Sequence, residues 1–288
     1  MSKAILAKTP TGEIQLTVTI PWPLVVKASD KAVEEIGQET TLAGFRKGKA
    51  PKELIKQKVG KEKIYEKVIQ IVVPEAYEEA VKEHDLKPIV FPKIEMLKAE
   101  EENDWVFRAI TAERPQINLE DYKEKVRKSL APKKLWTPEK GKPQAQEKGP
   151  TTEEKTQAAI SALLDSTSIT IPSMLVEEEV NRSLSNLINQ TASLGLTVEQ
   201  YLTSIGKSAD GLRTEYRQKV ETELKLQFIL DEIAQREKIE VAEKEIEDLI
   251  AASGDEKVKQ NLNTPLQKSF LKGILRRRKA LDFLGTLS

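Results

Sequence analysis

The chain has 288 residues with 46 basic and 46 acidic side chains, so its formal net charge is zero and we do not expect it to coat nucleic acid in general. Cysteine is absent and histidine occurs once, which excludes disulfides and argues against a transition-metal site. No apolar run approaches the ~20 residues of a membrane span, and the first residues lack the apolar core of a secretion signal. We therefore expect a cytoplasmic protein with no membrane partner and no metal.

The first 114 residues show the pattern of an α+β domain with one strand, then helices, then a hairpin. The first strand alternates apolar and polar residues, and two prolines end it. Pro74 falls inside the longest helical stretch and is expected to kink or divide it. Trp105 and Phe107 of the hairpin are expected in the core. In chain order, the predicted elements are a strand at 14–20, helices at 24–40, from 51 and at 61–82, and strands at 93–97 and 105–110.

A glycine-rich turn separates the first two predicted helices. It reads Gly44-Phe45-Arg46-Lys47-Gly48, and Pro51 follows it. Glycines allow a tight turn, so the three residues between them are expected to project from its tip. An exposed ring beside two cations favours a binding site, because Arg and Lys bind phosphates and carboxylates. A solvated basic turn with Phe45 tucked into the core fits the chemistry equally well.

Residues 115–150 have the composition of a linker, with four prolines among Lys, Glu, Gln and Gly in their second half. Asn118 is expected to cap a short amphipathic helix before these prolines. The apolar face of that helix consists of Leu119, Tyr122, Val126 and Leu130.

Residues 151–288 have helical spacing throughout and predict an all-α domain with long helical arms. Thr151 with Glu154, and Thr197 with Gln200, have the spacing of capping boxes. The first predicted helix begins at 151 and the second spans 172–194. A short third helix ends at Gly206. The remaining predicted helices span 212–236, 241–252 and 265–284.

The last predicted helix contains a basic segment, Lys268–Lys279, with six cations and no acidic residue. Taken alone, it could form a nucleic-acid patch. We favour a packed helix with a charged outer face, because apolar residues keep helical spacing beside the cations. These residues are Phe270, Leu271, Ile274, Leu275 and Leu281.

Two stretches resemble a known family. Gly44-Phe45-Arg46-x-Gly48-x-x-Pro51 is similar to the ribosome-docking motif of the trigger factor family, bacterial chaperones of the polypeptide exit tunnel. Residues 171–179, Ile-Pro-Ser-Met-Leu-Val-Glu-Glu-Glu, resemble the start of that family's C-terminal chaperone domain. The resemblance implies a ribosome-binding domain at 1–114, a linker at 115–150 and a client-binding domain at 151–288.

The resemblance also implies a function, that of an ATP-independent chaperone without cofactors. Phe45, Arg46 and Lys47 would contact a large-subunit ribosomal protein and adjacent rRNA, on a turn shaped by its two glycines. Dispersed apolar patches of the helical domain would shield nascent and unfolded polypeptides, while the residues that contact clients remain unknown. A homodimer away from the ribosome stays open. The complete set of implied ribosome-binding residues is Gly44, Phe45, Arg46, Lys47, Gly48 and Pro51.

Many members of this family carry a peptidyl-prolyl isomerase domain of the FK506-binding type after the ribosome-binding domain. Such a domain would need roughly a hundred residues, whereas the stretch from 115 to 150 offers 36. We therefore expect no isomerase domain and no enzymatic activity. The alternatives are a prolyl isomerase that retains activity and a nucleic-acid-binding protein that uses both basic segments. A periplasmic chaperone with a similar helical body is disfavoured by the missing secretion signal and by the docking motif.

Overall fold

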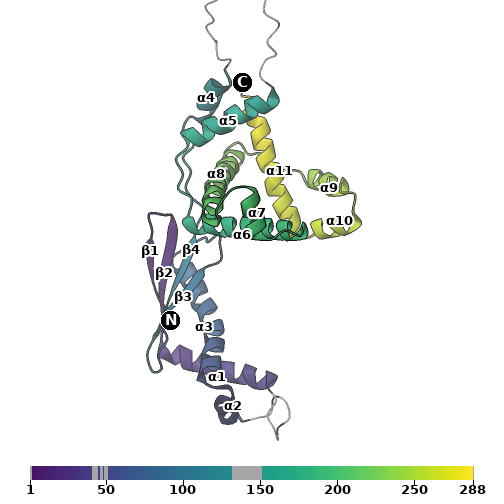
Figure 1. The fold of residues 1–288 in the computed structure, drawn as a ribbon. Helices are drawn as coiled ribbons and strands as arrows, with labels where there is room; N and C mark the ends of the chain where they lie inside the picture. The colour runs from purple at the N-terminus through teal and green to yellow at the C-terminus, as the bar shows by residue number, and fades with distance from the viewer. Residues whose placement is uncertain (1, 41–44, 46–47, 49–50, 132–150, 288) are drawn as a thin grey trace, which may run out of the picture. The chain divides into compact units, whose positions relative to one another are not determined.

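The computed structural model describes residues 2–40, 45, 48, 51–131 and 151–287. Contacts divide the chain into two compact units. Unit 1 consists of residues 1–114 with 172–175, and unit 2 consists of residues 115–171 with 176–288 (Figure 1). Of the helices in the described ranges, none has the length and apolarity that crossing a membrane requires.

Unit 1 contains a four-stranded antiparallel sheet with the strand order β1-β2-β4-β3. The predicted strands are confirmed to within two residues as β2 (Glu13–Ile20), β3 (Lys93–Lys98) and β4 (Trp105–Ala112). A strand that the sequence analysis did not predict, β1 (Lys3–Lys8), pairs with β2 at the edge of the sheet. None of its residues is fully buried, whereas every second residue of β2 is. A strand at the edge of the sheet with no buried face does not require a regular alternation of apolar and polar residues, so the sequence signal of β1 is weak.

Three helices of unit 1 share one hydrophobic core with this sheet, and the predicted helices are confirmed as α1 (Trp22–Glu39), α2 (Lys52–Val59) and α3 (Lys61–Glu83). The helix α3 continues through Pro74, so this proline does not divide it, and the alternative of a kink stays a prediction. Buried residues on both sides of the proline, Val73 and Ala76, hold the helix in the core.

The core of unit 1 is centred on two aromatic residues. Trp105 and Phe107 have no exposed surface, as predicted. The ring of Tyr65 meets that of Trp105 edge-on, with centroids 5.4 Å apart. The indole N–H of Trp105 donates to the carbonyl of Glu100 at 3.1 Å, so the one polar group of this side chain is satisfied.

The described part of unit 2 is entirely helical (Figure 1). Its long helices fall where the spacing predicted them, whereas the short helix α10 was not predicted. The largest fully buried residues of its core are Leu163, Ile229, Ile233 and Leu284. The helices are α4 (Tyr122–Leu130), α5 (Thr152–Ser166), α6 (Ser173–Ser193), α7 (Val198–Ser204), α8 (Ala209–Arg236), α9 (Glu243–Ala251), α10 (Glu256–Leu262) and α11 (Pro265–Gly285).

The predicted helix ends of unit 2 are confirmed in two places and wrong in one. Both capping boxes, at Thr151 and Thr197, are present. Asn118 does not cap α4, because the helix begins only at Tyr122, and Asp121 occupies the cap position with a left-handed backbone. The side chain of Asn118 instead donates to the carboxylate of Glu120 at 2.7 Å. The four apolar residues predicted for this helix face are buried in the core of unit 2.

Candidate functional site

The turn singled out in the sequence connects two helices that pack closely in unit 1. Ile55 of α2 is buried against Gly37 of α1. A Cβ atom on Gly37 would lie 2.5 Å from Cδ1 of Ile55, so the observed approach of the helices depends on glycine. The helix α1 ends at Glu39 and α2 begins at Lys52, so this contact fixes both ends of the connecting segment.

Three of the predicted site residues lie in the part of this segment that the structure describes. Phe45 is 40% exposed, so its ring is not sealed in the core. Gly48 has φ of +79°, a conformation that favours glycine. Pro51 precedes α2 with φ of −60°, at the cap rather than within the first turn. The other predicted site residues lie outside the described residues: Gly44, Arg46 and Lys47.

Acidic partners within unit 1 neutralise much of the positive charge next to the turn. Lys61 donates to Glu101 at 2.8 Å, and this hydrogen bond raises the pKa of Lys61. Lys67 pairs with Glu35 at 2.9 Å, which likewise raises the pKa of Lys67. By contrast, the sequence from 41 to 51 contains three cations and no acidic residue. In sequence, the turn is therefore a locally basic stretch.

A second candidate site is the apolar surface of unit 2. On α11, Leu266, Phe270 and Ile274 follow one another at a spacing of four and are 78%, 61% and 39% exposed. The expectation that Phe270 and Ile274 pack inward was wrong. Leu271 and Leu275, on the neighbouring face, contact the buried cluster of α9 instead. One face of α11 is thus used for packing and a second apolar face is left open.

An apolar groove of about 170 Å³ lies between α6, α7 and α8. Leu187, Ile188 and Tyr201 are among its lining residues. Thr191 also lines it, but its hydroxyl donates to the carbonyl of Leu187 at 3.0 Å and to that of Ile188 at 2.9 Å. The wall therefore offers apolar contact rather than free polar groups.

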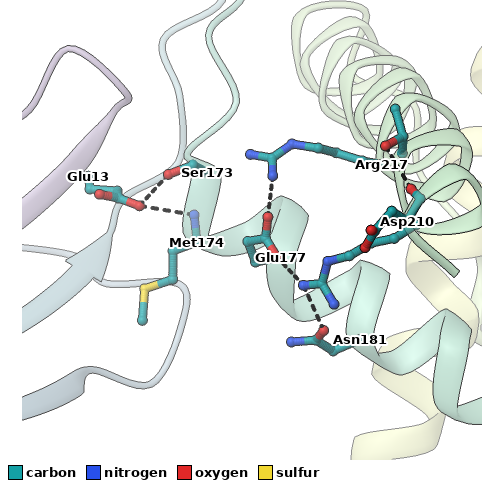
Figure 2. A network of polar contacts seen from close by, with 9 residues as sticks. Glu13, Ser173, Met174, Glu177, Asn181, Asp210 and Arg217 are labelled. Atoms are coloured by element: carbon teal, nitrogen blue, oxygen red, sulfur yellow. Dashed lines mark hydrogen bonds and ion pairs between the residues drawn. The ribbon is translucent and has the colours of Figure 1, made fainter.

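A cluster of polar and charged side chains in unit 2 links α6 to α8 (Figure 2). Glu177 accepts a hydrogen bond from Arg213 at 2.5 Å and another from Arg217. Arg213 also donates to the side chain of Asn181 at 3.2 Å. Two guanidinium groups on one carboxylate fix the helix pair more firmly than a single exposed ion pair would.

Within unit 1, the carboxylate of Glu13 binds the segment 172–175 (Figure 2). It accepts from the hydroxyl of Ser173 at 2.5 Å and from the backbone N–H of Met174 at 3.1 Å. The first N–H groups of a helix have no partner in the helix itself, so Glu13 satisfies one of them. The resemblance of residues 171–179 to a family motif thus includes a segment with a defined structural contact.

Comparison with known proteins gives two matching family models. The model described as "Bacterial trigger factor protein (TF)" matches residues 2–134, and "Bacterial trigger factor protein (TF) C-terminus" matches residues 118–286. The chain belongs to the trigger factor family. The N-terminal and C-terminal trigger factor models overlap on this chain, so they leave no interval between them for a further domain.

Curated trigger factors match less than half of the chain. The trigger factor of Moorella thermoacetica is 41% identical over 120 residues, which are 42% of this chain and 27% of the relative. That of Staphylococcus aureus (strain JH9) is 39% identical over 108 residues, or 38% of this chain and 25% of the relative. The chain therefore spans about a quarter of the length of the curated relatives it matches.

A solved trigger factor structure has the same fold. It comes from work titled "Promiscuous Substrate Recognition in Folding and Assembly Activities of the Trigger Factor Chaperone". The similarity covers 99% of both chains with a TM-score of 0.68, at 16% sequence identity. The predicted fold class, an α+β domain followed by a helical domain, is thereby confirmed.

The sequence located one of the two candidate sites of this trigger factor family member and missed the other. The turn could be recognised because its glycines and cations lie within a few residues of one another in the sequence. The open face of α11 did not, because the spacing shows that Phe270 and Ile274 share a face but not whether another helix covers it. The groove beside Tyr201 likewise depends on three helices meeting in space.

Proposed function

We propose that this chain is an ATP-independent chaperone that docks on the large ribosomal subunit at the exit tunnel and shields emerging polypeptides. The observation that supports this most strongly is the exposed ring of Phe45, on a turn with the docking sequence, in a chain of the trigger factor family. A chaperone role also accords with the open apolar faces of unit 2.

In this proposal the turn is the anchor. Phe45 enters an apolar pocket of an exit-tunnel protein, while Arg46 and Lys47 bind its acidic groups and the phosphates of adjacent rRNA. Gly44 and Gly48 allow the turn, and Pro51 starts the helix behind it. Holding a weak binder beside its substrate raises the local concentration to roughly the millimolar range, which compensates for weak client contacts.

The helical part supplies those contacts. Each buried methylene contributes only ~0.8 kcal/mol, so a client must touch several patches, such as the face with Phe270 and the groove with Tyr201, to be held. Folding of the client removes its apolar segments from these patches, which releases it without ATP. In this proposal residues 1–114 anchor the chain, residues 115–150 form a linker and residues 151–288 bind clients. The protein acts in the cytoplasm and has no membrane partner.

Ribosome co-sedimentation tests the proposal. The double charge reversal Arg46→Glu with Lys47→Glu is expected to abolish co-sedimentation and to leave the far-UV circular dichroism unchanged. The reversal Lys133→Glu with Lys134→Glu changes the net charge equally and is expected to leave binding intact. Unchanged co-sedimentation of the first variant would refute the anchor.

We further propose that the chain is not an enzyme. A protease-coupled assay on a cis-prolyl peptide is expected to show no acceleration of proline isomerisation. A measurable rate would favour the isomerase alternative instead.

A further inference from the structure

A row of cations on one face of α11 has no function in the account above. Lys268, Lys272 and Arg276 follow one another at a spacing of four. Like charges at this spacing repel one another and destabilise a helix. Other cations of the same segment have acidic partners: Arg277 lies 3.3 Å from Asp231 and Lys279 lies 2.7 Å from Glu245.

Two of these cations line a cleft of about 490 Å³ between α11 and the segment that follows α8. Lys272 and Arg276 come from α11, and Lys238 faces them from the segment after α8. Within the ranges that the structure describes, none of the three forms an ion pair. The Nε atom of Arg276 is buried and has no hydrogen-bond partner among the described residues, so the groups of the cleft that can reach a ligand are the terminal nitrogens of its guanidinium and the two lysines.

The wall opposite α11 has a fixed backbone. Lys238 has a left-handed conformation with φ of +53°, and its N–H donates to the carbonyl of Gln235 at 3.2 Å. The N–H of Ile239 donates to the carbonyl of Ala234 at 2.8 Å. Lys279 ties this wall to α11 by donating to the carbonyl of Glu240 at 3.0 Å. The cleft is therefore a preformed feature of unit 2.

We propose that this cleft, which we call the anion cleft, binds a small molecule that carries a phosphate monoester or a diphosphate group. Three cations line it against one carboxylate, that of Glu240, so the surplus is two positive charges. A phosphate monoester carries about −1.5 to −2 charges at neutral pH and complements this surplus. The guanidinium of Arg276 offers paired donors to phosphate oxygens, and the cleft volume falls in the range of small-molecule sites.

The charge also separates this ligand from two others. A carboxylate or an RNA phosphodiester carries a single charge, so several of them would have to lie along an extended track of cations. The anion cleft instead gathers three cations, Lys238, Lys272 and Arg276, around one space. Binding here involves neither the turn nor the open apolar face of α11, so the inference is independent of the proposed chaperone function.

Isothermal titration of the full chain with pyrophosphate at low salt tests the proposal. We expect saturable binding at one site, weakened about tenfold or more by Arg276→Gln through loss of a charged hydrogen bond. Arg278→Gln, an exposed position on the same helix that does not line the cleft, is the matched control and is expected to bind like the wild type. If Arg276→Gln does not fold, the double variant Lys238→Gln with Lys272→Gln replaces it, because both positions are exposed. This double variant should also bind pyrophosphate about tenfold or more weakly than the wild type.

Three results would overturn the proposal. The first is the absence of saturable binding at millimolar pyrophosphate. The second is an equal loss in Arg278→Gln, which would show general charge attraction rather than a site. The third is tighter binding of an oligo-aspartate peptide or an RNA oligomer than of pyrophosphate, with the same dependence on Arg276. Glycerol 3-phosphate, compared with inorganic phosphate, distinguishes an ester from the free ion, and saturable binding of either one that depends on Arg276 supports the site.

Discussion

Unit 1 and unit 2 use their large apolar residues in different ways. In unit 1 the sheet and the long helix enclose Trp105 and Phe107 completely. Unit 2 has a buried core as well, around Leu163 and Ile233, but the start of α11 leaves a regular apolar face open. Unit 1 thus concentrates its apolar surface in one core, and unit 2 divides its own between a core and open patches.

The contrast fits the two proposed tasks of the chain. A docking turn must keep its shape, and a closed core with a tight contact at Gly37 and Ile55 provides a rigid base. Client binding needs small, separate apolar areas that hold a partner weakly. Substitutions in the core of unit 1 should therefore reduce stability, whereas those on the open faces of unit 2 should reduce binding alone.

The largest effect is expected from Trp105→Ala. Removal of this fully buried ring leaves a cavity and should destabilise unit 1 by about 3–5 kcal/mol. Urea unfolding followed by tryptophan fluorescence, to which Trp22 of unit 1 contributes, measures the change. The control variant Trp105→Phe keeps an aromatic ring, so its unfolding free energy should fall clearly less. A loss below about 1 kcal/mol for the alanine variant would contradict a closed core.

Glu237→Gln tests the core of unit 2. Glu237 accepts from Lys123 and from the hydroxyl of Tyr122, at 2.7 Å for the latter, and these hydrogen bonds lower its pKa below the ordinary value of 4.5. Burial, together with the bond to Glu237, raises the pKa of Tyr122. We expect a loss of about 1–2 kcal/mol at neutral pH, because charged hydrogen bonds are replaced by neutral ones.

The pH dependence of this loss has a defined sign. A lowered carboxyl pKa stabilises the fold above the ordinary value, and this stabilisation disappears as the pH falls through the pKa of the folded state. The difference in unfolding free energy between wild type and Glu237→Gln should therefore be largest at neutral pH. It should disappear as the pH falls below 4.5. Urea unfolding followed by circular dichroism measures it. Glu247→Gln, at an exposed carboxylate of α9, is the control and should change the unfolding free energy at neutral pH by less than about 0.5 kcal/mol.

Two glycine substitutions compare the units directly. Gly37→Ala should destabilise unit 1 by about 1 kcal/mol, because Ile55 must move to make room. Gly273→Ala should stabilise α11 by about 0.5–1 kcal/mol, since its nearest neighbour would lie at an ordinary contact distance of 3.6 Å. Thermal unfolding of the two variants should thus shift in opposite directions. Equal shifts of the melting temperature would contradict the proposed difference in packing around Gly37 and Gly273.

The smallest effect on stability is expected on the open face of α11. Leu266→Ser with Phe270→Ser should change the unfolding free energy by less than about 0.5 kcal/mol for each exposed position. The same variant should suppress aggregation of a chemically denatured protein less well than the wild type. The control Phe91→Ser, at a 93% exposed position in unit 1, should leave this suppression unchanged. Full suppression by the double variant would exclude this face from client binding.

Much of the fold could be predicted from periodicity and helix signals. The alternation of β2 and the capping boxes at Thr151 and Thr197 are local properties of the sequence, and the structure confirms them. The strand β1 and the helix α10 were missed because neither has a fully buried residue, so neither leaves a strong apolar pattern.

The sites depend on tertiary structure to different degrees. The turn with Phe45 could be found because its glycines, ring and cations are neighbours in sequence. The anion cleft could not, since Lys238 and Arg276 are far apart in the chain and meet only where α11 passes the end of α8. The open face of α11 lies between these cases, because its residues were recognised as a helix face but were assigned to the interior.

The most direct test of the docking turn is a photo-crosslinking amino acid in place of Phe45, examined on ribosomes. The same group in place of Phe91 serves as the control, because that ring is exposed elsewhere in unit 1. We expect a crosslink from position 45 to a large-subunit component near the tunnel exit and none from position 91. Co-sedimentation without any ribosomal crosslink from position 45 would contradict it.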